Sequence, residues 1–338
     1  MRHIFASLAV LLPMAVIAVT GEAGEMPEAT RYDPLALPAG GGLKPADLTV
    51  RDQTRRREIP IRVYLPADKK PAAVVLFSHG LGGTRKGCTY LGKHWSARGY
   101  VVVFLQHPGS DDSVWRDQPI GGRMAAMRRA ASGRNFMLRV RDVPAVLDQL
   151  TAWNKGKEHL LASRMDLSRV GMSGHSFGAV TTQAVSGQAF AGRTPLTDPR
   201  IRAAIAFSPS SPRRGAPAAA FRLVKIPWML MTGTKDVAAI GNADLASRLA
   251  VYPALPGEKY ELVLHDGQHS AFTDRALPGD TGKRNPNHHR AILALSTAFW
   301  DLHLRKLAPA GAWLRGDGPR TVLEAKDRWQ FQAPREKQ

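Results

Sequence analysis

The segment RVGMSGHSFGAVTTQAV at residues 169–185 carries the main structural signal of this chain. An apolar run that is typical of a strand leads into a glycine-rich turn, and a helical pattern follows. A serine hydroxyl becomes a strong nucleophile when a sharp turn presents it beside a base, and that turn excludes side chains two residues before and after the serine. Gly174 and Gly178 satisfy this spacing around Ser176, whereas Ser173 lies inside the predicted strand. Ser176 is therefore the candidate nucleophile, and a plain glycine turn between strand and helix is the alternative.

Apolar runs of the same kind recur on both sides of this segment. Each is bounded by glycine, proline or polar residues, and helical patterns lie between them. Alternation of this kind predicts βαβ units on a mostly parallel central sheet with helices on both faces, an α/β fold. The expected strands are 48–50, 59–65, 72–77, 100–105, 169–173, 201–207, 228–232 and 260–264, and the expected helices are 88–97, 140–153, 177–185, 243–250 and 289–304.

Length and composition restrict the class of protein. The chain has 338 residues, of which 44% are hydrophobic, so it can bury a sizeable core. The single cysteine, Cys88, excludes an internal disulfide and a cysteine-rich zinc site, and we expect it to be a packing residue. No linker interrupts the alternation, which predicts one α/β domain at 47–306. Residues 107–138 form a long excursion within it, a candidate lid, and 307–338 form a C-terminal extension without an assigned role.

The N-terminus has the pattern of a secretory signal. Arg2 and His3 precede an apolar stretch at 4–19, which is short for a membrane span and ends in small residues. We expect a signal peptide at 1–23, an extended arm at 24–46, and a periplasmic or secreted protein; an uncleaved anchor is the alternative. The formal net charge is +19. Two explanations of this positive charge are open: a solvated basic surface, or a surface that attracts an anionic lipid or polymer. The sequence has no block of interleaved basic and aromatic residues that would indicate nucleic-acid binding.

A serine nucleophile requires a base and an acid, which follow it in the order acid then histidine at the ends of later strands. Asp236 follows the 228–232 run and His269 follows the 260–264 run, so we expect these residues to complete a triad with Ser176. The alternatives are Asp244 or Asp266 for the acid, and His265, His288 or His289 for the base.

The oxyanion that forms during acyl transfer needs two fixed backbone N–H donors. We expect one from Phe177, directly after the nucleophile, and the second from Leu81 in the loop SHGLGG at 78–83. Gly80 and Gly82 would let this loop approach the substrate closely. No Gly-Lys-Ser/Thr follows, which argues against a phosphate-binding loop.

These motifs together resemble the α/β-hydrolase superfamily of serine esterases. More narrowly, the chain is similar to bacterial relatives of platelet-activating factor acetylhydrolase, which are grouped near the dienelactone hydrolases. The similarity rests on VVLFSHGLGG (74–83), RGYVVVFLQHPGSD (98–111), RVRDVPAVLDQL (139–150) and VGMSGHSFGA (170–179), and with GTKD and DGQHSAF it spans about residues 48–306. It implies Ser176 as nucleophile, His269 as base and Leu81 and Phe177 as oxyanion donors.

Two departures limit what the resemblance implies about substrate. In the animal acetylhydrolases the acid follows the strand after the nucleophile helix, where this chain has Ala206-Phe207-Ser208-Pro209 without a carboxylate. The dienelactone hydrolases carry a cysteine nucleophile, where this chain has Ser176.

The expected function is that of an exported serine carboxylester hydrolase acting on short-acyl or lipid-like esters through an acyl-enzyme, without cofactor or metal. A lipase, polyester hydrolase or peptidase using the same triad, or a non-catalytic basic α/β binding protein, is the alternative. The 107–138 excursion contains five arginines and several apolar side chains. As a lid, this segment would offer its arginines to an anionic headgroup and its apolar side chains to an acyl chain. The alternative is a solvated connection that leads into the next helix.

Overall fold

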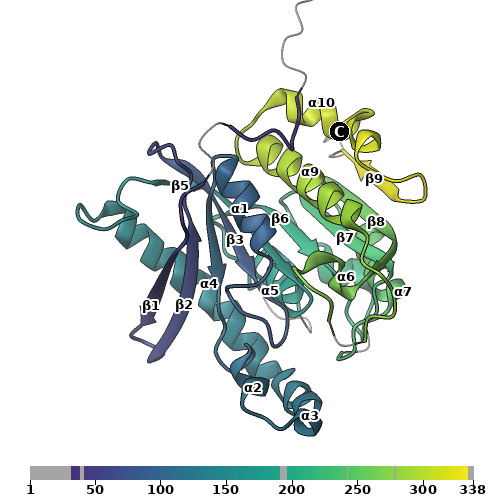
Figure 1. Ribbon diagram of the computed structural model, residues 1–338, viewed down its shortest axis with the longest axis horizontal. Coiled ribbons are helices and arrows are strands. Elements are labelled where there is room, and N and C mark those ends of the chain that lie inside the picture. Colours follow the sequence, from purple (N-terminus) through teal and green to yellow (C-terminus); the bar gives the residue numbers. More distant parts are fainter. Residues whose placement is uncertain (1–31, 39–41, 191–195, 242, 278, 334–338) are drawn as a thin grey trace, which may run out of the picture. The chain divides into compact units, whose positions relative to one another are not determined.

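A computed structural model of the chain describes residues 32–38, 42–190, 196–241, 243–277 and 279–333 (Figure 1). The chain divides into two compact units, Met1–Arg31 and Tyr32–Gln338. The first unit contains the expected signal peptide at 1–23 and the start of the expected arm at 24–46, and it lies outside the described residues.

A nine-stranded sheet forms the centre of the second unit, in the order β1-β2-β4-β3-β5-β6-β7-β8-β9 (Figure 1). The strands from β4 to β8 pair in parallel, whereas β1, β2 and β9 pair antiparallel at the two edges. The predicted α/β class with a mostly parallel sheet is thus confirmed. The strands are β1 (Ala46–Asp52), β2 (Arg57–Tyr64), β3 (Ala72–Ser78), β4 (Val101–Leu105), β5 (Met165–His175), β6 (Ile201–Phe207), β7 (Trp228–Lys235), β8 (Lys259–Gln268) and β9 (Arg328–Gln332).

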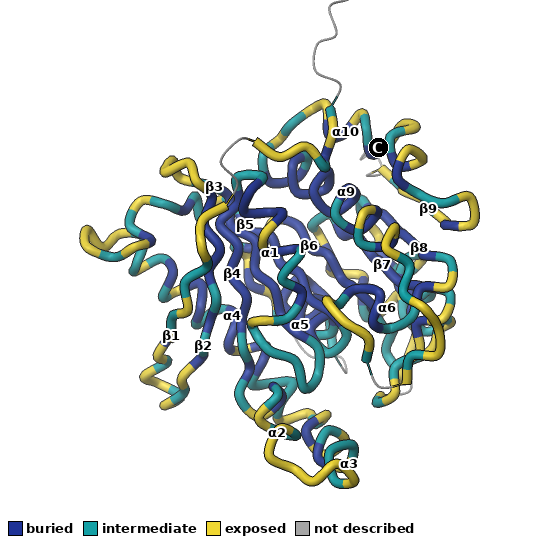
Figure 2. Tube along the Cα trace, viewed as in Figure 1, coloured by how far each residue is buried: buried dark blue, intermediate teal, exposed yellow. Residues whose placement is uncertain are grey.

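Helices cover both faces of this sheet, and most residues of the central strands are buried (Figure 2). The apolar residues of α1 and α9 pack on one face, and those of α4, α5, α6 and α8 on the other. The helices are α1 (Thr89–Ala97), α2 (Ser113–Arg116), α3 (Ile120–Ala130), α4 (Gly133–Lys155), α5 (Phe177–Val185), α6 (Pro217–Phe221), α7 (Leu245–Leu249), α8 (Val251–Ala254), α9 (Pro286–His303) and α10 (Ala308–Arg315), with 3₁₀ turns η1 (His269–Phe272) and η2 (Gly318–Thr321).

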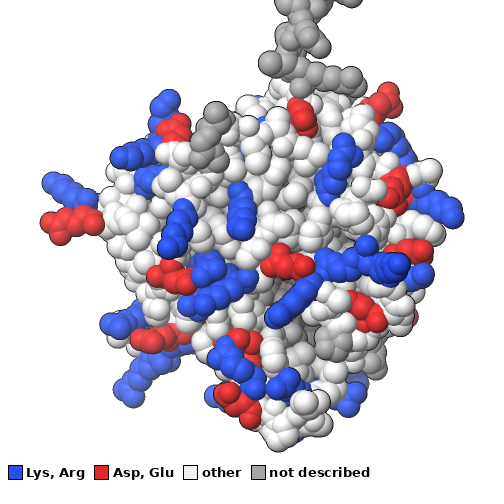
Figure 3. All heavy atoms as spheres, viewed as in Figure 1, with Lys and Arg blue, Asp and Glu red and all other residues white. Residues whose placement is uncertain are grey.

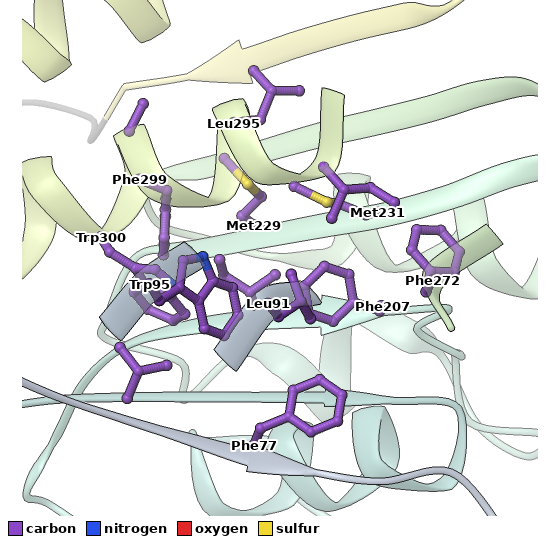
Figure 4. Packing of buried hydrophobic residues seen from close by; sticks show 14 of the residues in the cluster. Phe77, Leu91, Trp95, Phe207, Met229, Met231, Phe272, Leu295, Phe299 and Trp300 are labelled. Atoms are coloured by element: carbon purple, nitrogen blue, oxygen red, sulfur yellow. The ribbon is translucent and has the colours of Figure 1, made fainter. Parts of the chain in front are cut away.

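The period of two along each strand divides the core into these two layers, because successive side chains point to opposite faces. In β3, Val75 and Phe77 belong to the layer under α1 and α9, which also contains Trp95 and Trp300 (Figure 4). Val74 and Leu76 belong to the layer under α4. A continuous apolar run is therefore what a strand covered on both faces requires.

Two differences from the sequence-based expectation change the bounds of the candidate lid and of the domain. Helix α4 begins at Gly133 and not at 140, because Ser132 caps it by accepting a hydrogen bond from the N–H of Asn135. The candidate lid at 107–138 therefore contains α2, α3 and the start of α4 up to residue 138. The expected domain ended at 306, yet residues beyond it form α10 and add β9 to the sheet edge.

The surface is basic but mixed. On the face in Figure 3, lysine and arginine are scattered, with aspartate and glutamate between them. No helix in the described part of the chain has the length and apolarity that crossing a membrane needs. Cys88 is buried and its thiol donates to the carbonyl of Phe272, which agrees with a packing role.

Candidate active site

Ser176 lies on a strained turn between β5 and α5. Its backbone has φ 57° and ψ −115°, in a region that residues with side chains rarely adopt. A Cβ atom at Gly178 would overlap the carbonyl oxygen of Ser78, and a Cβ atom at Gly174 would overlap the carbonyl of Gly178. Both glycines are therefore required by close backbone packing, as the spacing predicted, and the turn leaves the Ser176 hydroxyl at the carboxyl end of the sheet.

Two further loops bring a histidine and an aspartate to this serine. His269 follows β8 directly, and its Nε2 lies 2.9 Å from the Oγ of Ser176. Asp236 follows β7, and its Oδ1 lies 2.6 Å from the Nδ1 of His269. The other carboxylate oxygen accepts a hydrogen bond from the hydroxyl of Thr232 at 2.9 Å. The three predicted side chains thus form one continuous hydrogen-bonded chain.

Asp236 is fully buried yet remains ionised. Burial raises the pKa of this carboxyl, but the hydrogen bond from His269 and the positive charge of Arg248 outweigh it and lower the pKa to about 2. A carboxylate that stays charged holds Nδ1 of the imidazole as the donor, which leaves Nε2 free to accept the serine proton. The side chain of His269 is 15% exposed, so the base can reach a substrate.

The structure places the alternative acids and bases elsewhere. Asp244 caps α7 by accepting from the N–H of Ser247, and the exposed Asp266 pairs with Lys235. Within β8, the side chain of His265 is part-exposed and lies 3.9 Å from Asp266. The remaining two histidines bond to backbone carbonyls, His288 to His265 and His289 to Thr273. None of these five side chains contacts Ser176 within the described part of the chain.

The loop after β3 lies against the nucleophile, as expected of the oxyanion loop. A Cβ atom at Gly80 would lie 3.4 Å from that of Ser176. The carbonyl of Gly80 accepts from Arg139, from the N–H of Gly83 and from the ring of His79. In a trans peptide the N–H points opposite to the carbonyl, so the Leu81 N–H points away from these donors. Among the described residues the N–H groups of Leu81 and Phe177 have no acceptor, so both are available to an oxyanion.

Arg139 holds this loop and was not foreseen from the sequence. Its guanidinium is fully buried, donates to the carbonyl of His79 at 2.7 Å and to the Oγ of Ser110 at 2.8 Å, and stacks 4.5 Å above the ring of Phe177. It therefore contacts both segments that provide the expected oxyanion donors. The sequence did contain a signal that residue 139 is buried, because at helical spacing it lies on the same face of α4 as the apolar residues Val143 and Leu150.

A second Ser–His–Asp chain lies beneath the loop. Ser78 Oγ lies 2.9 Å from Nε2 of His107, whose Nδ1 lies 2.9 Å from Oδ2 of Asp142. Arg55 and Arg57 pair with the same aspartate. All three side chains of this chain are fully buried, so no substrate can reach the serine. We interpret it as a structural network that ties β3 and β4 to α4.

His175, between the two glycine positions, links the nucleophile turn to the base. Its Nε2–H donates to the carbonyl of His269 at 2.9 Å, and the two rings lie 4.6 Å apart. Burial is the main cause that lowers the pKa of His175 well below 6.5. A neutral His175 thus fixes the backbone of the loop that carries the base.

We expect the protein to lose stability in mild acid. Burial lowers the pKa of His79 and His175 well below 6.5 and that of His107 to about 4. Below pH about 6.5 the unfolded chain binds protons at these histidines, whereas the folded chain does not. The free energy of unfolding should therefore fall by about 1.4 kcal/mol per pH unit for each such histidine.

Urea unfolding at pH 7 and pH 5 measures this effect. His175→Gln should show a pH dependence that is weaker by about 1.4 kcal/mol per pH unit. Equal stability of the wild type at the two pH values would contradict the prediction.

One cluster among the described residues has the composition of a metal site: His288, Glu324 and Asp327. Its ligand atoms are already engaged. Glu324 accepts from the side chains of Asn285 and Asn287, and both oxygens of Asp327 accept backbone N–H groups. We therefore interpret the cluster as a structural one.

A surface hollow of about 510 Å³ lies beside α1, away from the triad. Tyr64, Tyr90, Lys93 and residues 42–45 contribute to its lining. None of Ser176, Asp236 and His269 does so. Its position gives it no part in the chemistry of this site.

Comparison with known proteins gives no family for this chain. No protein-family model matches it, and no curated protein matches it.

Proposed function

We propose that this chain is a serine carboxylester hydrolase with an α/β-hydrolase fold, resembling the bacterial relatives of platelet-activating factor acetylhydrolase. The observation that carries the proposal is the hydrogen-bonded chain Ser176–His269–Asp236, with distances of 2.9 and 2.6 Å. Three further features support it: the strained turn at Ser176, the ionised acid, and the order serine, aspartate, histidine at successive strand ends.

Acylation would begin when Nε2 of His269 takes the proton of the Ser176 hydroxyl. The serine oxygen attacks the ester carbonyl, and the N–H groups of Leu81 and Phe177 donate to the oxyanion. When the tetrahedral intermediate collapses, the carbon–oxygen bond of the ester breaks and the protonated His269 gives its proton to the leaving alcohol. Asp236 stabilises the charged imidazole during this step.

Deacylation repeats the sequence with water. His269 takes a proton from the water, whose oxygen attacks the acyl-enzyme, and the same two N–H groups hold the second oxyanion. The bond to Ser176 then breaks and the serine oxygen recovers its proton from His269. A carboxylic acid is released and the enzyme is regenerated without any net change.

We propose that α2 and α3 shape the acyl side of the substrate. The indole N–H of Trp115 donates to the carbonyl of Gly82 at 2.8 Å, and a Cβ atom at Gly82 would overlap the sulfur of Met127. Both apolar side chains thus pack on the expected oxyanion loop. Arg128 and Arg129 are exposed on the same helix α3. This arrangement favours short-acyl or lipid-like esters, and we propose this segment as the lid.

We also propose export to the periplasm or the medium, on the basis of the apolar stretch at 4–19 with its small-residue end. An anionic lipid or polymer surface is the proposed partner of the basic surface.

A fluorophosphonate probe tests the proposed chemistry without knowledge of the substrate. We expect the folded protein to take up one probe molecule, with the adduct mapped by mass spectrometry to the peptide that contains Ser176. Protein unfolded in urea before addition is the control and should not react, because the activation of the serine depends on the folded triad.

Two outcomes would overturn the proposal. An adduct on a different serine would remove Ser176 from its role. Folded protein that stays unlabelled and hydrolyses no soluble ester, triglyceride, polyester or peptide would instead favour the non-catalytic binding protein.

A further inference from the structure

Arg248 on α7 is buried directly behind the triad, with its side chain 1% exposed. Its Nε donates to the backbone carbonyl of Asp236 at 2.8 Å. Its Nη1 donates to the carbonyls of Ser208 at 2.8 Å and Pro209 at 3.0 Å. The guanidinium therefore binds together the loops that follow β6 and β7, and its donors fix the backbone position of the acid.

The remaining nitrogen of Arg248 reaches the reacting groups. Nη2 lies 2.9 Å from Oδ1 of Asp236 and 3.3 Å from Nδ1 of His269. This carboxylate oxygen is the same one that accepts from His269, so imidazole and guanidinium share one acceptor. A permanent positive charge thus lies in contact with both the acid and the base.

The other polar groups around His269 do not duplicate this charge. The ring of His175, from β5, lies 4.6 Å from that of His269 at a tilt of 41°, and it is neutral because burial lowers the pKa of His175 well below 6.5. Ser176 is uncharged, and Asp236 is negative. Asp244, at the start of α7, interacts electrostatically with Arg248. Arg248 is therefore the cation that faces the imidazole within the described residues.

We infer that Arg248 is a positioning residue of the proposed esterase: it fixes Asp236 and, through its charge, keeps His269 neutral and able to accept a proton in mildly acidic solution. The inference rests on the proposed function. Asp236 favours the protonated imidazole, and the adjacent guanidinium opposes that effect. At a few ångströms such a charge shifts a protonation equilibrium by one or more pH units.

The test is the pH dependence of inactivation by a fluorophosphonate between pH 4.5 and 9, which follows the neutral fraction of the base. Relative to the wild type, the neutral variants Arg248→Met and Arg248→Gln should move the acid inflection upward by about one to two pH units. Arg248→Lys keeps the charge with fewer donors. It should react more slowly with its inflection near that of the wild type.

Arg98→Met is the matched control, because Arg98 also pairs with a buried aspartate, Asp301, and does not contact the triad. Its inflection should not move. A merely structural Arg248 would give folded neutral variants that are slower but have an unshifted inflection, and this result would overturn the inference. If neither neutral variant folds, Arg248→Lys decides, because an upward shift in a variant that retains the charge contradicts the proposed role.

The two proposals fail in different ways. If the wild-type protein does not react with the probe at any pH, the proposed function itself is contradicted. If the wild type reacts and the neutral Arg248 variants have the same acid inflection as the wild type, only the inference about Arg248 is contradicted.

Discussion

Ser176→Ala should lower the kcat for ester hydrolysis by about 10⁶-fold, the loss measured when the nucleophile of a serine hydrolase is removed. The remaining rate would come from binding and from the oxyanion donors Leu81 and Phe177. Alanine fills less space than serine, so the turn at φ 57° should still form and the free energy of unfolding should change little. Initial rates on a soluble short-chain ester, with thermal unfolding alongside, measure both quantities.

The matched control for this variant is Ser173→Ala. Ser173 is fully buried in β5, where its hydroxyl donates to the carbonyl of Leu76 at 2.8 Å. Its loss should cost about 1 kcal/mol of stability and leave the activity near that of the wild type. If Ser173→Ala abolished the activity and Ser176→Ala did not, the assignment of the nucleophile would be wrong.

Asp236→Asn should lower kcat by about 10⁴-fold at neutral pH. An amide at this position can donate to Nδ1 of His269 and so stabilise the wrong tautomer, in which Nε2 carries the proton and cannot accept one from Ser176. The variant would also leave the buried guanidinium of Arg248 without its carboxylate at 2.9 Å, so a loss of stability should accompany the loss of rate.

Asp244→Asn and Asp266→Asn are the matched controls, since both residues were alternative acids. Asn caps a helix about as well as Asp, so the first should leave α7 intact. The second breaks an exposed ion pair with Lys235, which contributes little to stability. Both should retain activity close to wild type. A similar loss in all three variants would point to a general effect of charge and not to a specific acid.

The strands were predictable because their signal is local. A strand buried on both faces needs a continuous apolar run, and β3, β4, β6 and β7 have one. The edge strand β9 was not found, because none of its residues is buried and it pairs with β8 on one side only. The early start of α4 was missed because none of its residues before Arg139 is buried, and Gly133 and Arg134 are exposed, although Phe136 to Leu138 are apolar.

The sequence by itself determined the α/β class and the position of the sharp turn, because apolar runs and the spacing of Gly174, Ser176 and Gly178 are properties of neighbouring residues. It also placed Asp236 and His269 at strand ends, where parallel strands converge. Only the tertiary structure selected Asp236 over Asp244 and Asp266, and only it placed Arg139 and Arg248. A buried arginine is held largely by backbone carbonyls from other loops. The positions of those carbonyls cannot be predicted from the residues that neighbour the arginine in sequence.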